Sequence, residues 1–109
     1  GEYNPTTWPG VRLPHCWVKD SQPIQDLIPE TYVLLKLGSD LLETKLFREI
    51  FEARGIPFTE IDISSDRIRD LYECNLILLR PDMHIAWRGT YEPTNALEIT
   101  QVATGFGRS

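Results

Sequence analysis

The chain has 109 residues, of which 41% are hydrophobic and 25% are charged, and this size and composition predict one globular domain with its own core. Acidic residues outnumber basic ones by 16 to 11 and no basic patch is interleaved with aromatic residues, so we expect no nucleic acid partner and no anionic membrane partner. No apolar run approaches the roughly 20 residues that span a bilayer, and no export signal is recognisable, so we expect a cytoplasmic protein.

Prolines dominate the start of the chain. A long helix is excluded there, because proline removes backbone donors and fixes φ. The segments 13–18 and 23–27 flank a polar turn, and this pattern predicts a short β-hairpin or an extended arm. We therefore expect residues 1–30 to form an extended arm with a short hairpin, and residues 31–109 to form the core of the same domain.

The middle of the chain predicts a β-α-β unit. Residues 31–37 form an apolar run that is typical of a strand covered on both faces. A helix should follow over about 40–54, starting at the capping pair Asp40 and Glu43. The alternating run at 58–63 predicts a second strand, parallel to the first. The inward face of the helix should carry Leu42, Leu46, Phe47, Ile50 and Phe51.

The last part of the chain predicts a short helix, a hairpin and a terminal helix. Ser65 is placed to cap the short helix. The apolar runs at 75–80 and 84–89 are separated by turn-forming residues, so they should pair as an antiparallel hairpin. A helix over about 93–104 should end at Gly105. Its inward residues should be Ala96, Ile99, Val102 and Ala103.

This order of elements is similar to that of the thioredoxin-like fold, which belongs to the α/β class. We therefore predict a four-stranded mixed sheet in the order 2-1-3-4, counted along the core, with helices on both faces and an N-terminal extended arm or hairpin. Fold alone does not establish function, so the residues must be tested for chemistry.

Thiol chemistry is the first possibility to test on such a fold. A thiol oxidoreductase would place its reactive cysteine at the start of the helix that follows the first core strand, where the helix dipole stabilises a thiolate. The sequence there reads GSDLLE and contains no sulfur. Cys16 precedes the first core strand and Cys74 precedes the third, so we expect two free thiols and neither disulfide exchange nor peroxide reduction.

Other catalytic constellations are equally absent from the sequence. His15 and His84 are far apart and have no evident orienting group, which argues against a nucleophilic triad and against a zinc site. No glycine-rich fingerprint follows a predicted strand, so no dinucleotide cradle is expected. We therefore predict no catalytic, cofactor-binding or metal-ligating residue in this chain.

The three tryptophans are the remaining residues of interest. Tryptophan gains much from desolvation and usually anchors a core or an interface. Trp17 and Trp87 are the candidates for an interface. Arg88 is expected to pair with a carboxylate, either of this chain or of a partner, and the sequence favours the first only slightly.

Two stretches of the sequence resemble a known family. NLILLRPDMHIAWRG, residues 75–89, resembles the pattern LVRPDGHVAWRG near the C-terminus of FAD-dependent aromatic-ring hydroxylases, the phenol-hydroxylase-like flavoprotein monooxygenases. PGVRLPHCWV, residues 9–18, resembles the segment PGARAPHxWL that opens their C-terminal thioredoxin-like domain. Met83 stands where the family usually carries glycine, so we expect the turn to avoid a positive φ. The matching framework residues are Pro14, His15, Arg80, Pro81, Asp82, Trp87, Arg88 and Gly89.

The resemblance implies a role inside a longer enzyme. In such hydroxylases FAD-binding and substrate domains precede this one, NAD(P)H reduces the flavin, and O2 is used to hydroxylate an aromatic ring. The C-terminal domain lacks redox cysteines and serves packing or oligomer contact, including contact within a homo-oligomer. No flavin-binding motif maps onto this chain, so we expect neither activity nor a cofactor for the chain alone, and FAD and NAD(P)H in the parent.

Two alternatives stay open at this stage. One is a stand-alone, redox-inactive thioredoxin-like interaction module that binds a partner through the region of Trp17 and Trp87. The other, less favoured, is a thiol enzyme that uses Cys74 or Cys16.

Overall fold

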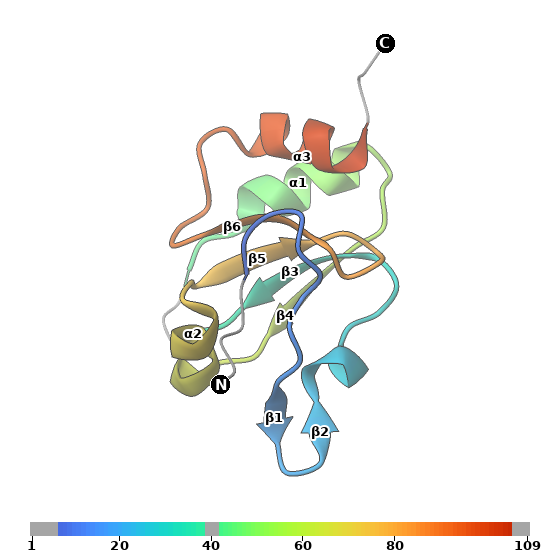
Figure 1. The fold of residues 1–109 in the computed structure, drawn as a ribbon. Helices are drawn as coiled ribbons and strands as arrows, with labels where there is room; N and C mark the ends of the chain where they lie inside the picture. The colour runs from blue at the N-terminus through green and yellow to red at the C-terminus, as the bar shows by residue number, and fades with distance from the viewer. Residues whose placement is uncertain (1–6, 39–41, 106–109) are drawn as a thin grey trace.

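The computed structural model describes residues 7–38 and 42–105 and has an α/β architecture (Figure 1). The main sheet contains four strands, β3 (Tyr32–Lys36), β4 (Phe58–Asp62), β5 (Leu76–Leu79) and β6 (Ile85–Gly89). Three α-helices accompany it, α1 (Lys45–Ala53), α2 (Asp66–Tyr72) and α3 (Ala96–Thr104). The N-terminal part contributes a small antiparallel hairpin and a 3-10 helix, namely β1 (Trp17–Lys19), β2 (Gln22–Pro23) and η1 (Ile24–Leu27).

The sheet is mixed, with its strands in the order β4-β3-β5-β6. Strands β3 and β4 are parallel and are connected through α1, as the length of this segment predicts. Strand β5 runs antiparallel to both β3 and β6, and the β5-β6 pair is the predicted hairpin. Strands β3 and β5 lie inside the sheet and are covered on both faces, which explains why both appear in the sequence as continuous apolar runs.

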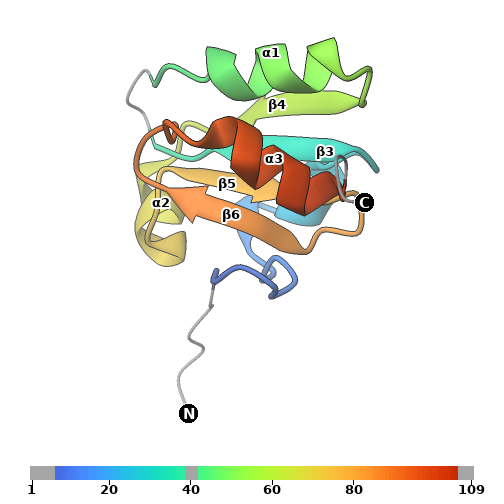
Figure 2. The ribbon, with the colours of Figure 1, turned by 90° about the horizontal axis from the view of Figure 1, so that it is seen from above.

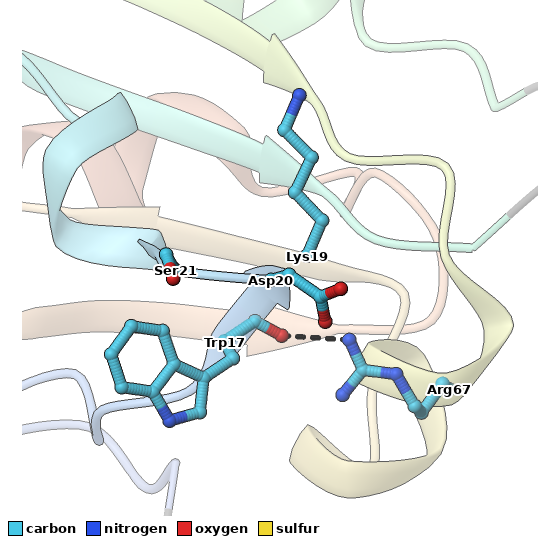
Figure 3. A pocket seen from close by; sticks show the side chains of 5 residues that line it. All are labelled: Trp17, Lys19, Asp20, Ser21 and Arg67. Atoms are coloured by element: carbon cyan, nitrogen blue, oxygen red, sulfur yellow. Dashed lines mark hydrogen bonds between the residues drawn. The ribbon is translucent and has the colours of Figure 1, made fainter.

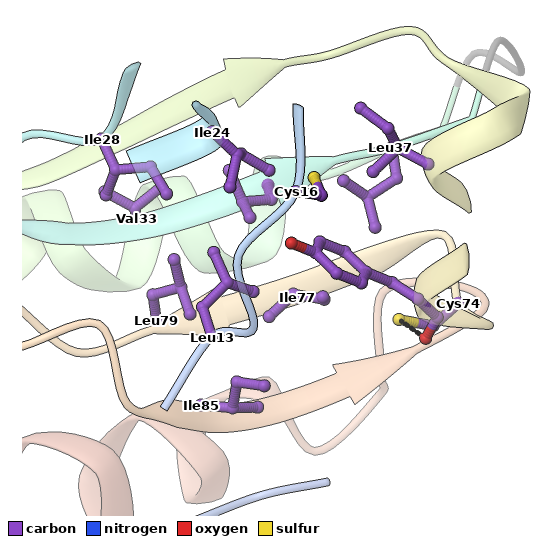
Figure 4. Packing of buried hydrophobic residues seen from close by; sticks show 13 residues of the cluster. Leu13, Cys16, Ile24, Ile28, Val33, Leu37, Cys74, Ile77, Leu79 and Ile85 are labelled. Carbon is purple, nitrogen blue, oxygen red and sulfur yellow. Dashed lines mark hydrogen bonds between the residues drawn. The ribbon is translucent and has the colours of Figure 1, made fainter. Parts of the chain in front are cut away.

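Helices cover both faces of the sheet. Alternate residues of a strand point to opposite faces, so Leu34 and Val33 belong to different cores. Helices α1 and α3 lie side by side over the first core (Figure 2), which contains Leu34, Phe47, Phe51, Leu76, Leu78 and Ala96. Helix α2 and the N-terminal segment cover the second core (Figure 4), which contains Leu13, Cys16, Ile24, Ile28, Val33, Leu35, Leu37, Ile68, Tyr72, Cys74, Ile77, Leu79 and Ile85.

The N-terminal end of α1 is stabilised by a residue distant in sequence. The carboxylate of Glu92 accepts hydrogen bonds from the backbone N–H groups of Leu46 (3.0 Å) and Phe47 (2.9 Å). The predicted cap at Asp40 lies outside the described residues. The prediction that Leu46 faces inward is wrong, because the buried face of the helix runs through Phe47 and Phe51 and leaves Leu46 exposed.

The β5-β6 turn corrects another expectation. Met83 has φ of 68°, so the prediction that the turn avoids a positive φ is wrong. The N–H of Met83 donates to the carbonyl of Arg80 (2.9 Å), and the register between the strands shifts at Leu78 and Leu79. A tight turn followed by a left-handed residue is the usual geometry of a short hairpin with a bulge. The hairpin therefore imposes the left-handed conformation on whichever residue occupies position 83.

The remaining helices follow the sequence more closely. The side chain of Ser65 accepts a hydrogen bond from the N–H of Ile68 (3.2 Å), so the predicted cap of α2 is confirmed. Helix α3 ends at Gly105, also as predicted. Val102 was expected to point inward but is 63% exposed; the buried position on that face is taken by Thr100, whose hydroxyl donates back to the carbonyl of Ala96 (2.8 Å). No helix among the described residues is long and apolar enough to cross a membrane.

Candidate functional site

The entrance of helix α1 offers no reactive sulfur. Both cysteines are free and buried, and both belong to the core on the opposite face of the sheet from α1 (Figure 4). Burial raises the pKa of the Cys74 thiol, although the nearby Arg88 charge works in the other direction. A buried thiol with a raised pKa is a poor nucleophile, so neither the position of the two cysteines nor the raised pKa of Cys74 supports thiol catalysis.

Arg88 lies at the centre of the polar cluster on this side of the sheet. Its Nη1 donates to the hydroxyl of Thr7 (2.5 Å) and to the carbonyl of Tyr72 (3.4 Å), while its guanidinium carbon lies 4.1 Å from the centre of the Trp8 ring. The expected carboxylate partner is not found among the described residues, where Arg88 forms no ion pair. Its charge instead faces the carbonyl end of α2 and an aromatic face, both of which favour a cation.

Trp87 and Gly89 form a contact on the other face of strand β6. The ring of Trp87 lies 5.4 Å from that of Phe47 and packs against the core under α1 and α3. Residues 87 and 89 point to the same face of the strand, so the indole lies over Gly89. A Cβ at position 89 would lie 2.4 Å from Cζ2 of Trp87, which is far inside van der Waals contact. The glycine of the AWRG motif therefore provides space for the tryptophan.

The residues of the RPDMH turn hold the hairpin in shape. The backbone N–H of His84 donates to the carboxylate of Asp82 (3.0 Å), and this hydrogen bond lowers the pKa of Asp82. The N–H of Arg80 donates to the carbonyl of His84 (2.9 Å), which closes the turn around the exposed Pro81. These contacts account for Asp82 by turn geometry, and they use only the backbone of His84.

The N-terminal motif PHCW contributes to the opposite core. The carbonyl of Pro14 accepts a hydrogen bond from the hydroxyl of Tyr72. The ring of His15 stands edge-on to the ring of Trp17, with centroids 4.9 Å apart. Trp17 is 52% exposed, whereas Trp87 is partly buried within the chain, so the two candidate interface residues lie in different environments.

A surface concavity of about 580 Å³ adjoins the β1-β2 hairpin (Figure 3). One Nη atom of Arg67, from α2, donates to the carbonyls of Trp17 (2.7 Å) and Val18 (3.2 Å) and fastens the hairpin to the helix. The other lining residues are Lys19, Asp20 and Ser21. The concavity is open and mixed in charge, and no group of three metal-ligating side chains occurs in the described part of the chain.

Sequence reasoning missed most of the partners in these sites. The hydrogen-bond acceptors of Arg88 belong to Thr7 and Tyr72, which lie 81 and 16 residues away in the sequence. Glu92, which caps α1, follows the hairpin without any local signal of its role. The motif did indicate the strand that carries these contacts, because its Trp87 and Gly89 both lie in β6 and pack against each other.

Comparison with known proteins places these features in a family. Residues 6–108 match the family described as "Aromatic-ring hydroxylase, C-terminal". The chain belongs to this family. The resemblance inferred from the two sequence motifs is therefore confirmed.

The relatives of this chain are longer proteins. The chain is 26% identical to the FAD-dependent monooxygenase apdD of Emericella nidulans over 96% of the chain and 18% of that protein. It is 30% identical to the phenol 2-monooxygenase of a Pseudomonas strain over 76% of the chain and 16% of that protein. The solved structure of the rebeccamycin biosynthetic enzyme RebC with reduced flavin has a TM-score of 0.85 at 30% identity, covering 96% of this chain and 20% of RebC. The chain thus spans about a fifth of the length of the proteins it matches.

Proposed function

We propose that this chain is the redox-inactive, thioredoxin-like C-terminal domain of a FAD-dependent aromatic-ring monooxygenase and that it serves packing or oligomer contact. The observation that carries the proposal is that no sulfur occupies the α1 entrance, while both thiols are buried elsewhere, in a member of this hydroxylase family. In the described part of the chain both thiols are buried and no metal-ligating cluster occurs, which favours a supporting role for this domain over a catalytic one.

We place the FAD-binding and substrate domains, with their FAD and NAD(P)H, in the rest of the parent chain. The relatives are named as FAD-dependent monooxygenases, and this chain corresponds to about a fifth of their length. The two free thiols support a reducing compartment, so we propose the cytoplasm as its location.

The arm of residues 1–30 is proposed to be part of the same domain as residues 31–109. Leu13, Cys16 and Ile24 belong to the same buried core as Val33 of the central strand. An arm that contributes this much of one core is not a separable linker, because removing it would expose the apolar face of the sheet.

We propose Trp17 as the residue through which the domain contacts the rest of its parent. Trp17 stands half exposed on a hairpin that Arg67 holds rigidly against α2, which suits a contact residue that loses little entropy on binding. Trp87, the second candidate, already has an intrachain partner in Phe47, so its proposed contribution is to support the surface from within.

The decisive experiment titrates FAD with the pure 109-residue chain and follows flavin fluorescence. We expect no saturable change at micromolar concentrations and no coloured complex after gel filtration. Saturable flavin binding by this chain would contradict the proposal.

In the parent enzyme, Trp17→Ser should weaken the association of this domain with the remainder, whereas Lys19→Ser on the same hairpin should not.

A further inference from the structure

Residues 7–13, here called the strap, lie along the edge of strand β6 as an irregular additional strand. The N–H of Gly10 donates to the carbonyl of Ile85 (2.8 Å), and the N–H of Ile85 donates to the carbonyl of Val11 (2.8 Å). The N–H of Leu13 donates to the carbonyl of Met83 (2.9 Å). Because β6 is the last strand of the sheet, the strap covers the start of an edge that would otherwise be open to pairing with another chain.

The strap is anchored at its two ends and exposed between them. Thr7 and Leu13 are buried, whereas the five residues between them are exposed. Leu13 is part of the core that includes Cys16 and Ile24, so this end is held by apolar packing. A segment with few buried apolar contacts opens at a lower free energy than the domain unfolds.

The Thr7 end is held by hydrogen bonds that converge on one carbonyl. Tyr72 is the last residue of α2, and its carbonyl accepts from the hydroxyl of Thr7 (2.7 Å), from Nη1 of Arg88 (3.4 Å) and from the thiol of Cys74 (3.5 Å). The hydroxyl of Thr7 in turn accepts from Arg88, and the ring of Trp8 lies over the guanidinium. Thr7 and Arg88, which are distant from each other in sequence, therefore meet at the C-terminal end of one helix, where a cation is favoured.

We propose that the strap opens and closes as a unit about Leu13, that Arg88 is the clasp that holds it closed, and that the closed strap seals the Cys74 thiol. Cys74 is 4% exposed and shares the Tyr72 carbonyl with Thr7, so displacement of Thr7 removes a group that lies beside the sulfur. The position of the chain at Thr7 is thereby coupled to access to Cys74 and to the β6 edge.

The test measures alkylation of Cys74 by iodoacetamide in the folded Cys16→Ser chain, followed by mass spectrometry. Arg88→Gln removes the charge-assisted hydrogen bonds of the clasp, and we expect alkylation to become roughly ten- to a hundredfold faster, because the rate follows the population of the open state. The direction of the change in alkylation rate is diagnostic. Loss of the Arg88 charge would by itself raise the pKa of the thiol and slow the reaction, so acceleration reports opening.

Two controls separate strap opening from general loosening. In the Cys74→Ser chain, Arg88→Gln should leave alkylation of Cys16 unchanged, because Cys16 lies in the core beyond the hinge. Arg48→Gln, which removes an arginine of α1 that pairs with Glu60 of β4, should leave Cys74 protected. Equal acceleration at both cysteines, or a Cys74 rate that is unchanged or slower, would overturn the proposal.

A second variant covers the case in which Arg88→Gln does not fold. Trp8 is 61% exposed, so Trp8→Ala leaves the core intact and removes only the stacking partner of the clasp. We expect Cys74 alkylation to become about two- to fivefold faster in Trp8→Ala. Val11 is exposed on the same strap and is not among the hydrogen-bond or stacking partners of Arg88, so Val11→Ala should have no such effect. Equal rates in the two variants would exclude the clasp.

Discussion

Replacing Gly89 with alanine tests how the AWRG motif is built. The new Cβ would lie 2.4 Å from Cζ2 and 2.9 Å from Cη2 of Trp87, so either the indole or strand β6 must move. The indole cannot move freely, because the side chain of Phe47, a residue of α1, packs against it. Overpacking of this kind typically costs about 1–3 kcal/mol, and we expect Gly89→Ala to lower the free energy of unfolding by about 2 kcal/mol.

A double-mutant cycle with Trp87→Ala identifies the cause. Trp87→Ala alone should cost about 3 kcal/mol, the lower part of the range for large aromatic side chains, because Trp87 is only partly buried. In that background the clash is gone, and Gly89→Ala should be close to neutral or slightly stabilising, because alanine restricts the unfolded chain more than glycine does. Urea unfolding with an unchanged m value measures each corner of the cycle.

The result that would refute this reasoning is an equal cost of Gly89→Ala in both backgrounds. The penalty would then come from the backbone of β6 and not from the indole. Gly55→Ala is an informative comparison: no atom beyond its own chain neighbours lies within 4 Å of its added Cβ, but its φ of +66° disfavours alanine, so its cost should be the same with or without Trp87.

Three further predictions concern caps and charge. Glu73→Gly should stabilise the domain by about 1 kcal/mol in thermal unfolding. Glu73 ends α2 at a φ of 62°, which favours glycine, and it places a negative charge at the negative end of the helix dipole. Glu73→Ala removes the charge but keeps the strained φ, so it should stabilise the domain less, and an equal gain would contradict this. Glu92→Ala should cost about 1 kcal/mol and increase hydrogen exchange at the N–H groups of Leu46 and Phe47 before other α1 amides; uniform exchange across α1 would argue against a capping role. Burial raises the pKa of Glu60, but hydrogen bonds from Arg48 and Thr44 outweigh burial and lower this pKa. Ionised Glu60 therefore stabilises the fold above the ordinary Glu pKa of about 4.3, and this contribution disappears as the pH falls. The free energy of unfolding should change less with acid in Glu60→Gln than in the unmodified chain, and identical titrations would contradict the assignment.

The elements that the sequence predicts well are those whose signal is local. The runs at 31–37 and 75–80 lie in strands covered on both faces, and hydrophobic burial on both sides leaves no alternative to an apolar sequence. The cap at Ser65 and the stop at Gly105 also depend only on neighbouring backbone.

The errors have separate physical causes. Glu92 caps the first turn of α1, and no periodicity in the helix itself reports that contact. Val102 is apolar yet exposed, because Thr100 satisfies its own hydroxyl within the helix and so can occupy the buried position. Met83 adopts a positive φ because the hairpin bulge requires it, and the rule that favours glycine there describes a cost, not a prohibition.

The RPDMHIAWRG stretch holds enough polar chemistry to suggest an active site, but its contacts account for it as framework. Asp82 shapes the turn through the backbone of His84, and Gly89 makes room for Trp87. Arg88 carries a charge into a partly buried setting, and it uses that charge on Thr7 and on the end of α2. Strand β6 thus presents packing residues to one face and a charged clasp to the other. If the strap opens as proposed, the contact between Arg88 and the strap is where a substitution should change conformation without unfolding the domain.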